Sequence, residues 1–504
     1  MKQIFTILVL LVTIGCETLD ESDLESRSLE DIVKASGEYV STNAREFTLS
    51  ARAYAPFPEG YTAMSQDAQL AAMETAMDRR LNVIARAVKR HIDDVLRPLN
   101  NGVTDEKAAY FTYFRRNESR SADYVAPAGS DQFEFALELE FVGSYYLMSK
   151  LSPSTGSARR TFDVEVGSAS GGGSSLIEFE ISGQPNHDAF PRYRELFEDG
   201  IFDIGIHFGG DYNEERLDLE TAKWLVDLLI EDGWINDEVS RFEDLEIDSA
   251  PFTRSLVIEN QSVEVRVYIY HSDMVESSEE IRLTEVMHRS LESRDVVFYS
   301  GHAGENAGFI LDYQPRHEIK AIDFSALPLA QKYQIYLLDG CRTYRTYVRD
   351  LMKNERKSFE TLDLVTTVNT TPFSAGYRLI YEFLYWFTIT NDDGAHFPIS
   401  WKDVLRGVNT RTLRSVHYGV HGIANNPKLN PHGSDNTLCK PCDIDSQCGS
   451  GGNFCLNYPG QKACGVACTT DGACGDGFRC ARITEDPKLF YLPKQCVKKS
   501  YRCD

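Results

Sequence analysis

A long stretch near the N-terminus has apolar residues at helical spacing. They fall three or four positions apart between residues 64 and 96, and Pro98 and the turn Asn100-Asn101-Gly102 follow. This pattern predicts one long amphipathic helix that ends before the proline. The apolar positions are Leu70, Met73, Met77, Leu81, Ile84, Val88, Ile92 and Leu96.

Alternating apolar and polar residues flank this helix and predict strands. In the clearest case, residues 133–141, every second residue is Phe or Leu, so one face of the strand is apolar. We therefore expect residues 37–189 to form an α+β accessory domain built on an antiparallel sheet. The other predicted strands are 45–55, 109–114, 161–166 and 176–181.

From residue 190 the pattern changes to short apolar runs that alternate with helical stretches. This alternation predicts an α/β domain over 190–424, with a mostly parallel sheet and helices on both faces. The predicted strands are 200–208, 262–270, 295–301, 333–340 and 362–370, and the predicted helices are 219–233, 279–292, 341–354 and 378–390.

Two of these strands end in residues that carry chemistry. The segment "VVFYSGHAG" places His302 just after one strand, and "IYLLDGCRTY" places Cys341 just after the next. Active residues gather at the carboxyl ends of strands in such sheets. A helix after Cys341 would favour its thiolate, and His302 could exchange the proton. The backbone N–H groups of Cys341 and Ala303 could hold an oxyanion.

These two segments resemble the caspase-like superfamily of cysteine peptidases, which includes caspases, legumain, clostripain and gingipain. The resemblance implies a caspase-like fold for 190–424, with Cys341 as nucleophile and His302 as acid and base. The chain departs from the family pattern at two positions. Ala303 follows the histidine where the family usually has glycine, and Gly340 precedes the cysteine where many members carry alanine.

Members of this superfamily recognise the substrate residue that precedes the scissile bond, and they bind it in a charged pocket. The candidate wall residues follow the first strand and the strand after the cysteine, and an acidic pocket would favour Arg or Lys in the substrate. A solvated loop is the alternative interpretation of these carboxylates. The candidates are Asp211, Glu214, Glu215, Arg216 and the segment 370–374, which includes Thr371.

The first residues predict export. Lys2 precedes a short apolar run, Ile4 to Ile14, which is too short to span a membrane. The following Gly15-Cys16 resembles a bacterial lipoprotein signal, which implies removal of the segment before Cys16, lipidation of Cys16 and a membrane anchor in the cell envelope. Secretion with cleavage elsewhere is the alternative. Residues 17–36 are acidic and polar, and we expect a tether there.

The composition limits the partners. The 504 residues carry a net charge of −24, which argues against nucleic acid, because phosphate binding needs a basic face. No pattern requires a cofactor or a metal. A pair of histidines in "HYGVH" (residues 417–421) has helical zinc spacing, but glycines argue against a helix there.

Cysteines mark a third region. Ten of the 12 lie between 439 and 503, after a linker at 425–438, and they predict a disulfide-rich module at 439–504 that binds a surface partner. If Cys16 carries lipid, Cys341 is the one unpaired thiol. The ten are Cys439, Cys442, Cys448, Cys455, Cys464, Cys468, Cys474, Cys480, Cys496 and Cys503.

Together these observations predict an exported cysteine endopeptidase that hydrolyses protein or peptide substrates through a thioester on Cys341. The alternative is a catalytically inactive lipoprotein of the same fold that binds a protein or glycan partner.

Overall fold

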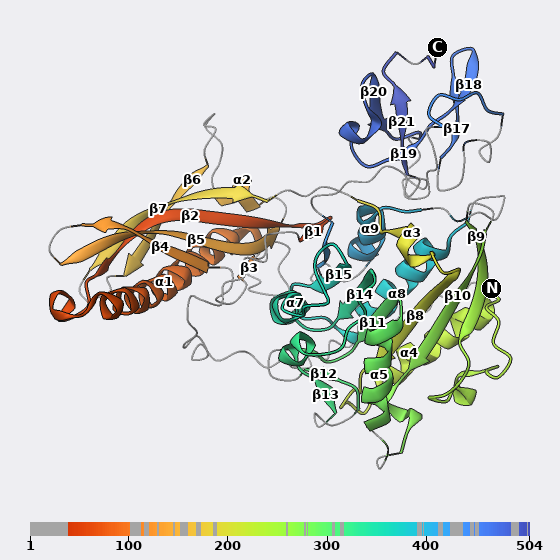
Figure 1. Ribbon diagram of the computed structural model, residues 1–504, viewed down its shortest axis with the longest axis horizontal. Helices are drawn as coiled ribbons and strands as arrows, with labels where there is room; N and C mark the ends of the chain where they lie inside the picture. The colour runs from red at the N-terminus through yellow and green to blue at the C-terminus, as the bar shows by residue number, and fades with distance from the viewer. Residues whose placement is uncertain are drawn as a thin grey trace.

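The structure is a computed structural model with a mixed α/β architecture, and it has three parts in space (Figure 1). The structure describes residues 39 to 503, apart from 101–111, 115–119, 129–130, 145–146, 152–159, 168–172, 185–188, 259–260, 277–278, 280, 305–307, 313–316, 391–395, 397, 412–416, 424–436, 444–447, 449–452, 485–492 and 501. The predicted signal peptide with Cys16, the predicted tether and most of the predicted linker therefore lie outside the described residues.

The first part is an antiparallel sheet with one long helix across it. The helix α1 (Gln66–Leu96) buries the predicted apolar positions except Leu70, which is exposed. It packs on the face of the sheet that carries Phe133, Phe135 and Leu137. The strands are β2 (Ala44–Pro56), β3 (Thr112–Phe114), β4 (Arg120–Pro127), β5 (Gln132–Ser144), β6 (Thr161–Gly167) and β7 (Ser174–Gly183).

The second part is built on five strands that pair in parallel in the order β10-β8-β11-β14-β15. Every residue of β11, β14 and β15 is buried, which explains why their sequences are mostly apolar. Two antiparallel strands, β9 (Phe252–Ile258) and β16 (Tyr418–His421), flank them. The five are β8 (Ile201–Phe208), β10 (Gln261–Tyr270), β11 (Val296–Ser300), β14 (Gln334–Asp339) and β15 (Leu362–Thr367).

Helices pack against both faces of these strands. Along β11, Val296 and Phe298 face one apolar cluster, whereas Val297 and Tyr299 face the other. The first cluster includes residues of α3 (Tyr193–Leu196), α4 (Leu217–Glu231), α8 (Phe373–Thr388) and α9 (Trp401–Arg411), and the second includes residues of α5 (Ile281–Ser293) and α7 (Val348–Met352).

The helix predicted over 341–354 is two short helices, α6 (Thr343–Thr346) and α7. Arg342 has a φ of 56°, in the left-handed region, so a helix cannot begin at Cys341. Local sequence patterns did not predict β4, β9, β16 or α9.

A short strand joins the first two parts into one sheet. In β1 (Val40–Ser41), Val40 pairs with Val420 of β16 and with Arg45 of β2. The predicted accessory domain is thus continuous with the central sheet, as Figure 1 shows.

The third part, at the C-terminus, is held by five disulfides, which confirms the predicted disulfide framework. Ala467 and Phe454 of this module pack against the apolar cluster of α8 and α9. Its strands are β17 (Cys455–Tyr458), β18 (Gln461–Cys464), β19 (Ala467–Cys468), β20 (Phe478–Ala481) and β21 (Lys494–Lys498). The pairs are Cys439–Cys503, Cys442–Cys455, Cys448–Cys464, Cys468–Cys480 and Cys474–Cys496.

Smaller elements complete the described residues. Within that part of the chain, no helix is both long and apolar enough to cross a membrane. The smaller elements are α2 (Leu147–Leu151), β12 (Phe309–Ile310), β13 (Glu318–Ile319) and the 3-10 turns η3 (Tyr61–Ala63), η4 (Pro98–Asn100), η7 (Phe242–Asp244), η8 (Ser272–Met274), η9 (Ala321–Ser325) and η11 (Asp471–Cys474).

Candidate functional site

Three neighbouring strands of the central sheet, β8, β11 and β14, are each followed by a glycine. These are Gly209, Gly301 and Gly340. A Cβ placed on Gly301 would lie 2.9 Å from Cα of Gly209, and one on Gly340 would lie 3.0 Å from the carbonyl oxygen of Gly301. The three backbones therefore touch at the carboxyl edge of the sheet, and side chains there would force them apart.

The strand register extends into these glycines. Ser300 pairs with Phe208 on one side and with Asp339 on the other. The Gly209 amide donates to the Ser300 carbonyl at 2.9 Å, and the Gly301 amide donates to the Asp339 carbonyl at 3.1 Å.

The residues just beyond the glycines are consequently neighbours at this edge. Asp211 follows β8, His302 follows β11 and Cys341 follows β14. His302 and Cys341 each lie two positions past the paired residues Ser300 and Asp339.

The two departures from the family pattern occupy the same place in space. A Cβ on Gly340 would lie 2.5 Å from Cβ of Ala303, which is closer than two such atoms approach. The alanine methyl group thus fills the space that a side chain at 340 would need. The methyl group of Ala303 and the absence of a side chain at Gly340 are therefore sterically complementary.

The His302 ring lies between aromatic groups and a carboxylate. It stacks on Tyr212 with centroids 4.8 Å apart, and it meets Phe373 edge-on at 5.1 Å. Its Nε2 lies 3.6 Å from Oδ1 of Asp211, which is longer than a hydrogen bond. The side chain is 19% exposed. Burial lowers the pKa of the His302 imidazole, and the Asp211 carboxylate partly opposes that shift.

Asp211 supports the loop and the histidine. Its side chain is fully buried and accepts hydrogen bonds from the backbone amides of Asn213 and Leu217, both at 3.2 Å. This position revises the prediction that Asp211 forms the wall of an open pocket. The sequence signal was available in "FGGD", since it places a glycine and then a reactive side chain after a strand, as "SGH" and "DGC" do.

The other predicted pocket residues do not converge. Glu214 and Glu215 are exposed. The Arg216 guanidinium pairs with Asp218 at 3.0 Å and Asp273 at 3.1 Å, so these carboxylates already hold it.

Thr371, the last of the predicted wall residues, contacts the residue that precedes Cys341. Its hydroxyl donates to the Gly340 carbonyl at 3.0 Å. The Thr367 hydroxyl donates to the same carbonyl. These contacts fix the peptide that leads into Cys341.

Cys341 is 8% exposed and belongs to none of the apolar clusters formed by the described residues. Its sulfur is disulfide-bonded, although the five disulfides of the C-terminal module do not include it. The prediction of an unpaired thiol at Cys341 depended on lipidation of Cys16, and in this structure Cys341 is instead in a disulfide. Ala303, the other predicted oxyanion residue, is buried.

A buried acid lies beneath these residues, and the sequence analysis did not single it out. Asp339 accepts hydrogen bonds from the Ser300 hydroxyl at 2.7 Å and from the Tyr418 hydroxyl at 2.6 Å. Burial raises the pKa of Asp339 to about 6, and the two hydrogen bonds limit the rise. This carboxyl ties the ends of β11, β14 and β16 together.

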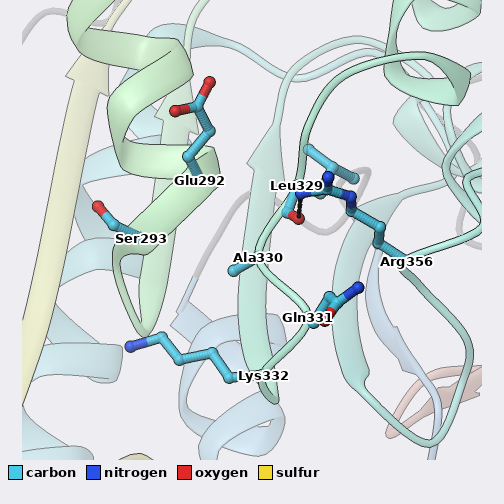
Figure 2. Close-up of a pocket in the computed structure, with 7 residues that line it drawn as sticks. All are labelled: Glu292, Ser293, Leu329, Ala330, Gln331, Lys332 and Arg356. Carbon is cyan, nitrogen blue, oxygen red and sulfur yellow. Dashed lines mark hydrogen bonds between the residues drawn. The ribbon is translucent and has the colours of Figure 1, made fainter.

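The pocket of about 500 Å³ in Figure 2 lies elsewhere. Its lining residues end α5 or precede β14 and β15, so it opens at the amino edge of the sheet, opposite His302. The Arg356 guanidinium in it donates to the Leu329 carbonyl, and Lys332 pairs with Asp295 at 2.6 Å. Both cationic side chains of this pocket, Arg356 and Lys332, therefore already have partners within the protein.

Metal-ligand spacing among the described residues occurs in two groups of three cysteines. All six belong to the disulfides of the C-terminal module, and a sulfur in a disulfide is not a thiolate ligand. The groups are Cys442, Cys448 and Cys464, and Cys468, Cys474 and Cys496.

No protein-family model, curated protein or solved structure matches the chain. The chemistry of the carboxyl edge is therefore the basis for a functional proposal.

Proposed function

We propose that residues 190–424 form a caspase-like cysteine peptidase domain, with Cys341 as nucleophile, His302 as acid and base, and Asp211 as the residue that orients His302. The observation that carries the proposal is the register of β8, β11 and β14. It sets a carboxylate, an imidazole and a cysteine on adjacent strand ends, in the order that proton transfer requires.

The ring nitrogens of His302 then have separate tasks. Nε2 faces Asp211, which leaves Nδ1 to take the proton of the Cys341 thiol. The thiolate attacks the substrate carbonyl carbon, and a C–S bond forms. The C–N bond then breaks, and the imidazolium gives its proton to the departing amine. Water attacks the thioester, which releases the acid and restores the thiol.

This chemistry requires Cys341 as a thiolate, and the structure holds it as a disulfide. A thiol reductant must act first. Two equivalents of reductant thiol become one disulfide, and the Cys341 disulfide becomes two thiols. A molecule with Cys341 in a disulfide is thus active only after reduction.

The setting of the protein forms part of the proposal. Five disulfides in one small module favour an oxidising compartment outside the cytoplasm, and the predicted lipoprotein signal agrees with that location. We infer an exported, lipid-anchored protein of the cell envelope. Ten of the 12 cysteines form the disulfides of the C-terminal module, so lipidation of Cys16 leaves Cys341 as a thiol in the anchored form.

The rival function is a binding lipoprotein without catalysis. The disulfide on Cys341 favours it, since an oxidised nucleophile cannot attack. In this case the accessory sheet or the C-terminal module binds a protein or glycan partner.

Covalent labelling separates the two functions. The purified chain, with and without treatment by a mild thiol reductant, is incubated at neutral pH with a peptidyl acyloxymethyl ketone probe. Wild type is compared with His302→Ala and Cys341→Ala, and mass spectrometry locates the label. The control is His288→Ala, because His288 lies on α5 and away from the strand ends.

The peptidase proposal expects labelling of Cys341 after reduction, with a rate about 100-fold lower in His302→Ala and unchanged in His288→Ala. Equal labelling rates with and without His302, or no labelling of reduced Cys341, would rule out the dyad and leave the binding function.

A further inference from the structure

A second site lies far from His302, where the C-terminal module meets the central domain. A cavity of about 180 Å³ opens between the start of α9 and strands β19 and β21. Figure 1 shows the module above α9 and α3. One water molecule occupies about 30 Å³ of liquid, so the cavity has room for a small polyatomic ion.

The lining of this cavity is basic in an acidic protein. Lys402 and Arg406 come from α9, and Arg482 and Lys494 come from the module. Among the described residues of the lining, Asp403 is the one acidic residue, and it pairs with Arg406. The whole chain carries a net charge of −24, so this concentration of positive charge is local.

One cation here has its charge unmatched. Among the described residues, the Lys494 ammonium forms no ion pair. Its backbone is fixed, because Lys494 pairs with Cys468, which forms a disulfide with Cys480. The ammonium is thus held beside the cavity without a counter-charge from the described part of the chain.

A buried hydroxyl in the lining also lacks a partner. Thr469 is 8% exposed, and its Oγ1 makes no hydrogen bond to any described residue. Buried polar atoms are rarely left unpaired, so an unsatisfied hydroxyl at a cavity indicates a missing ligand. Thr469 directly follows the Cys468 that pairs with Lys494, so both groups lie at the same end of the cavity.

We propose that this cavity binds a phosphate group. Lys494 supplies a point charge, the Thr469 hydroxyl donates a hydrogen bond, and the arginines supply planar donors suited to a tetrahedral oxyanion. The cavity lies at the first turn of α9, an 11-residue helix whose amino end adds a favourable field for an anion. A bound phosphate would join the module to the central domain.

The test uses the full-length chain with its disulfides intact, since the module buries part of the core of the central domain. Isothermal titration calorimetry with inorganic phosphate compares wild type with two pairs of variants. Lys494→Ala is paired with Lys499→Ala, which removes the same charge from an exposed position of the module. Thr469→Val is paired with Thr469→Ser, which keeps the hydroxyl.

We expect Lys494→Ala and Thr469→Val each to weaken phosphate binding by about tenfold, and the two controls to bind like wild type. Near-identical unfolding temperatures without phosphate would show that the variants fold. Failure of wild type to bind phosphate, or equal weakening by Lys494→Ala and Lys499→Ala, would overturn the site.

A second arm distinguishes free phosphate from a lipid headgroup. Phosphatidylcholine vesicles with and without phosphatidic acid are sedimented with each variant, and inorganic phosphate is added as competitor. Phosphatidic acid-dependent sedimentation that needs Lys494 and is displaced by phosphate would assign a lipid phosphate. Binding of inorganic phosphate without sedimentation would assign a soluble one. Neither result depends on Cys341, so this site and the peptidase proposal fail independently.

Discussion

At the scale of single residues, the candidate site depends on how three side chains share protons. His302 is held between two rings and beside a buried carboxylate, and burial keeps the pKa of its imidazole below the ordinary value. The ring is therefore neutral at neutral pH, in the form that accepts a proton. The Asp211 carboxylate, 3.6 Å from Nε2, raises the His302 pKa and so opposes part of the effect of burial.

Asp211→Asn removes the charge that raises the pKa of His302, so we expect this pKa to fall further. Titration of the His302 ring protons by NMR measures the shift directly. After reduction, the labelling rate of Cys341 should fall by about tenfold or more. Glu214→Gln removes an exposed carboxylate three positions away and serves as the control. An unchanged His302 titration in Asp211→Asn would contradict the assigned role.

The close approach of Gly340 and Ala303 at the strand ends leads to a second prediction. Gly340→Ala places a methyl group against Ala303 and should destabilise the fold by about 1–3 kcal/mol. The double variant Ala303→Gly with Gly340→Ala removes the methyl group that the new side chain would meet and should recover most of that loss. Urea unfolding of the two single variants and the double variant gives the coupling energy. Additive effects would mean that the two residues do not compete for space.

At the scale of elements, the ends of β11, β14 and β16 are connected by the Asp339 carboxyl. It accepts hydrogen bonds from Ser300 and Tyr418, and Gly376 at the start of α8 leaves room for it. A side chain at 376 would collide with both Ser300 and Asp339. The strand ends and the following helix are thus packed around one buried acid directly below the candidate site.

This acid predicts a pH dependence. Its pKa is about 6 in the fold and 3.8 in the ordinary case, so the folded state binds the proton more tightly than the unfolded chain. Its contribution to the free energy of unfolding is therefore largest below pH 3.8 and is lost as the pH rises to about 6.

Asp339→Asn removes this titration. The free energy of unfolding of the variant relative to wild type should rise by about 1–3 kcal/mol between pH 4 and pH 6, and stay level above that. Urea unfolding at several pH values measures it, with the exposed Asp237→Asn as the control. A difference that does not change with pH would show that Asp339 is not protonated in this range.

At the scale of the whole molecule, the first two parts share one sheet, and their side chains interlock where they meet. The Tyr344 hydroxyl, on the helix after Cys341, donates to Oε1 of Glu46 on β2 at 2.8 Å. Tyr39 packs edge-on against Tyr344 with ring centroids 5.1 Å apart. Glu46 is 1% exposed, so its carboxylate depends on such donors. The accessory sheet therefore contacts the segment that follows Cys341.

Tyr344→Phe deprives the buried Glu46 carboxylate of this donor, which should lower the free energy of unfolding by about 1–3 kcal/mol. Hydrogen exchange should also accelerate in β2, although the change is in α6. Tyr124→Phe, at an exposed position of β4, is the matched control. Exchange confined to the neighbourhood of Tyr344 would show that the two parts open independently.

The sequence by itself determined the local elements and the edge at which the chemistry lies. Apolar spacing predicted α1, the run of buried residues in β11 and β14 predicted those strands, and an even set of ten cysteines predicted the disulfide module. These features depend on residues that are close together in the chain, so the spacing of residue types along the sequence is enough to predict them. It also set His302 and Cys341 after consecutive predicted strands.

Only the tertiary structure decided which distant residues meet. Asp211 reaches His302 because β8 pairs beside β11, and Ala303 opposes Gly340 because β11 pairs beside β14. The basic cavity at α9 also brings together chain segments far apart in sequence. Strand order and register are set by the packing of the entire core, so local patterns do not encode them.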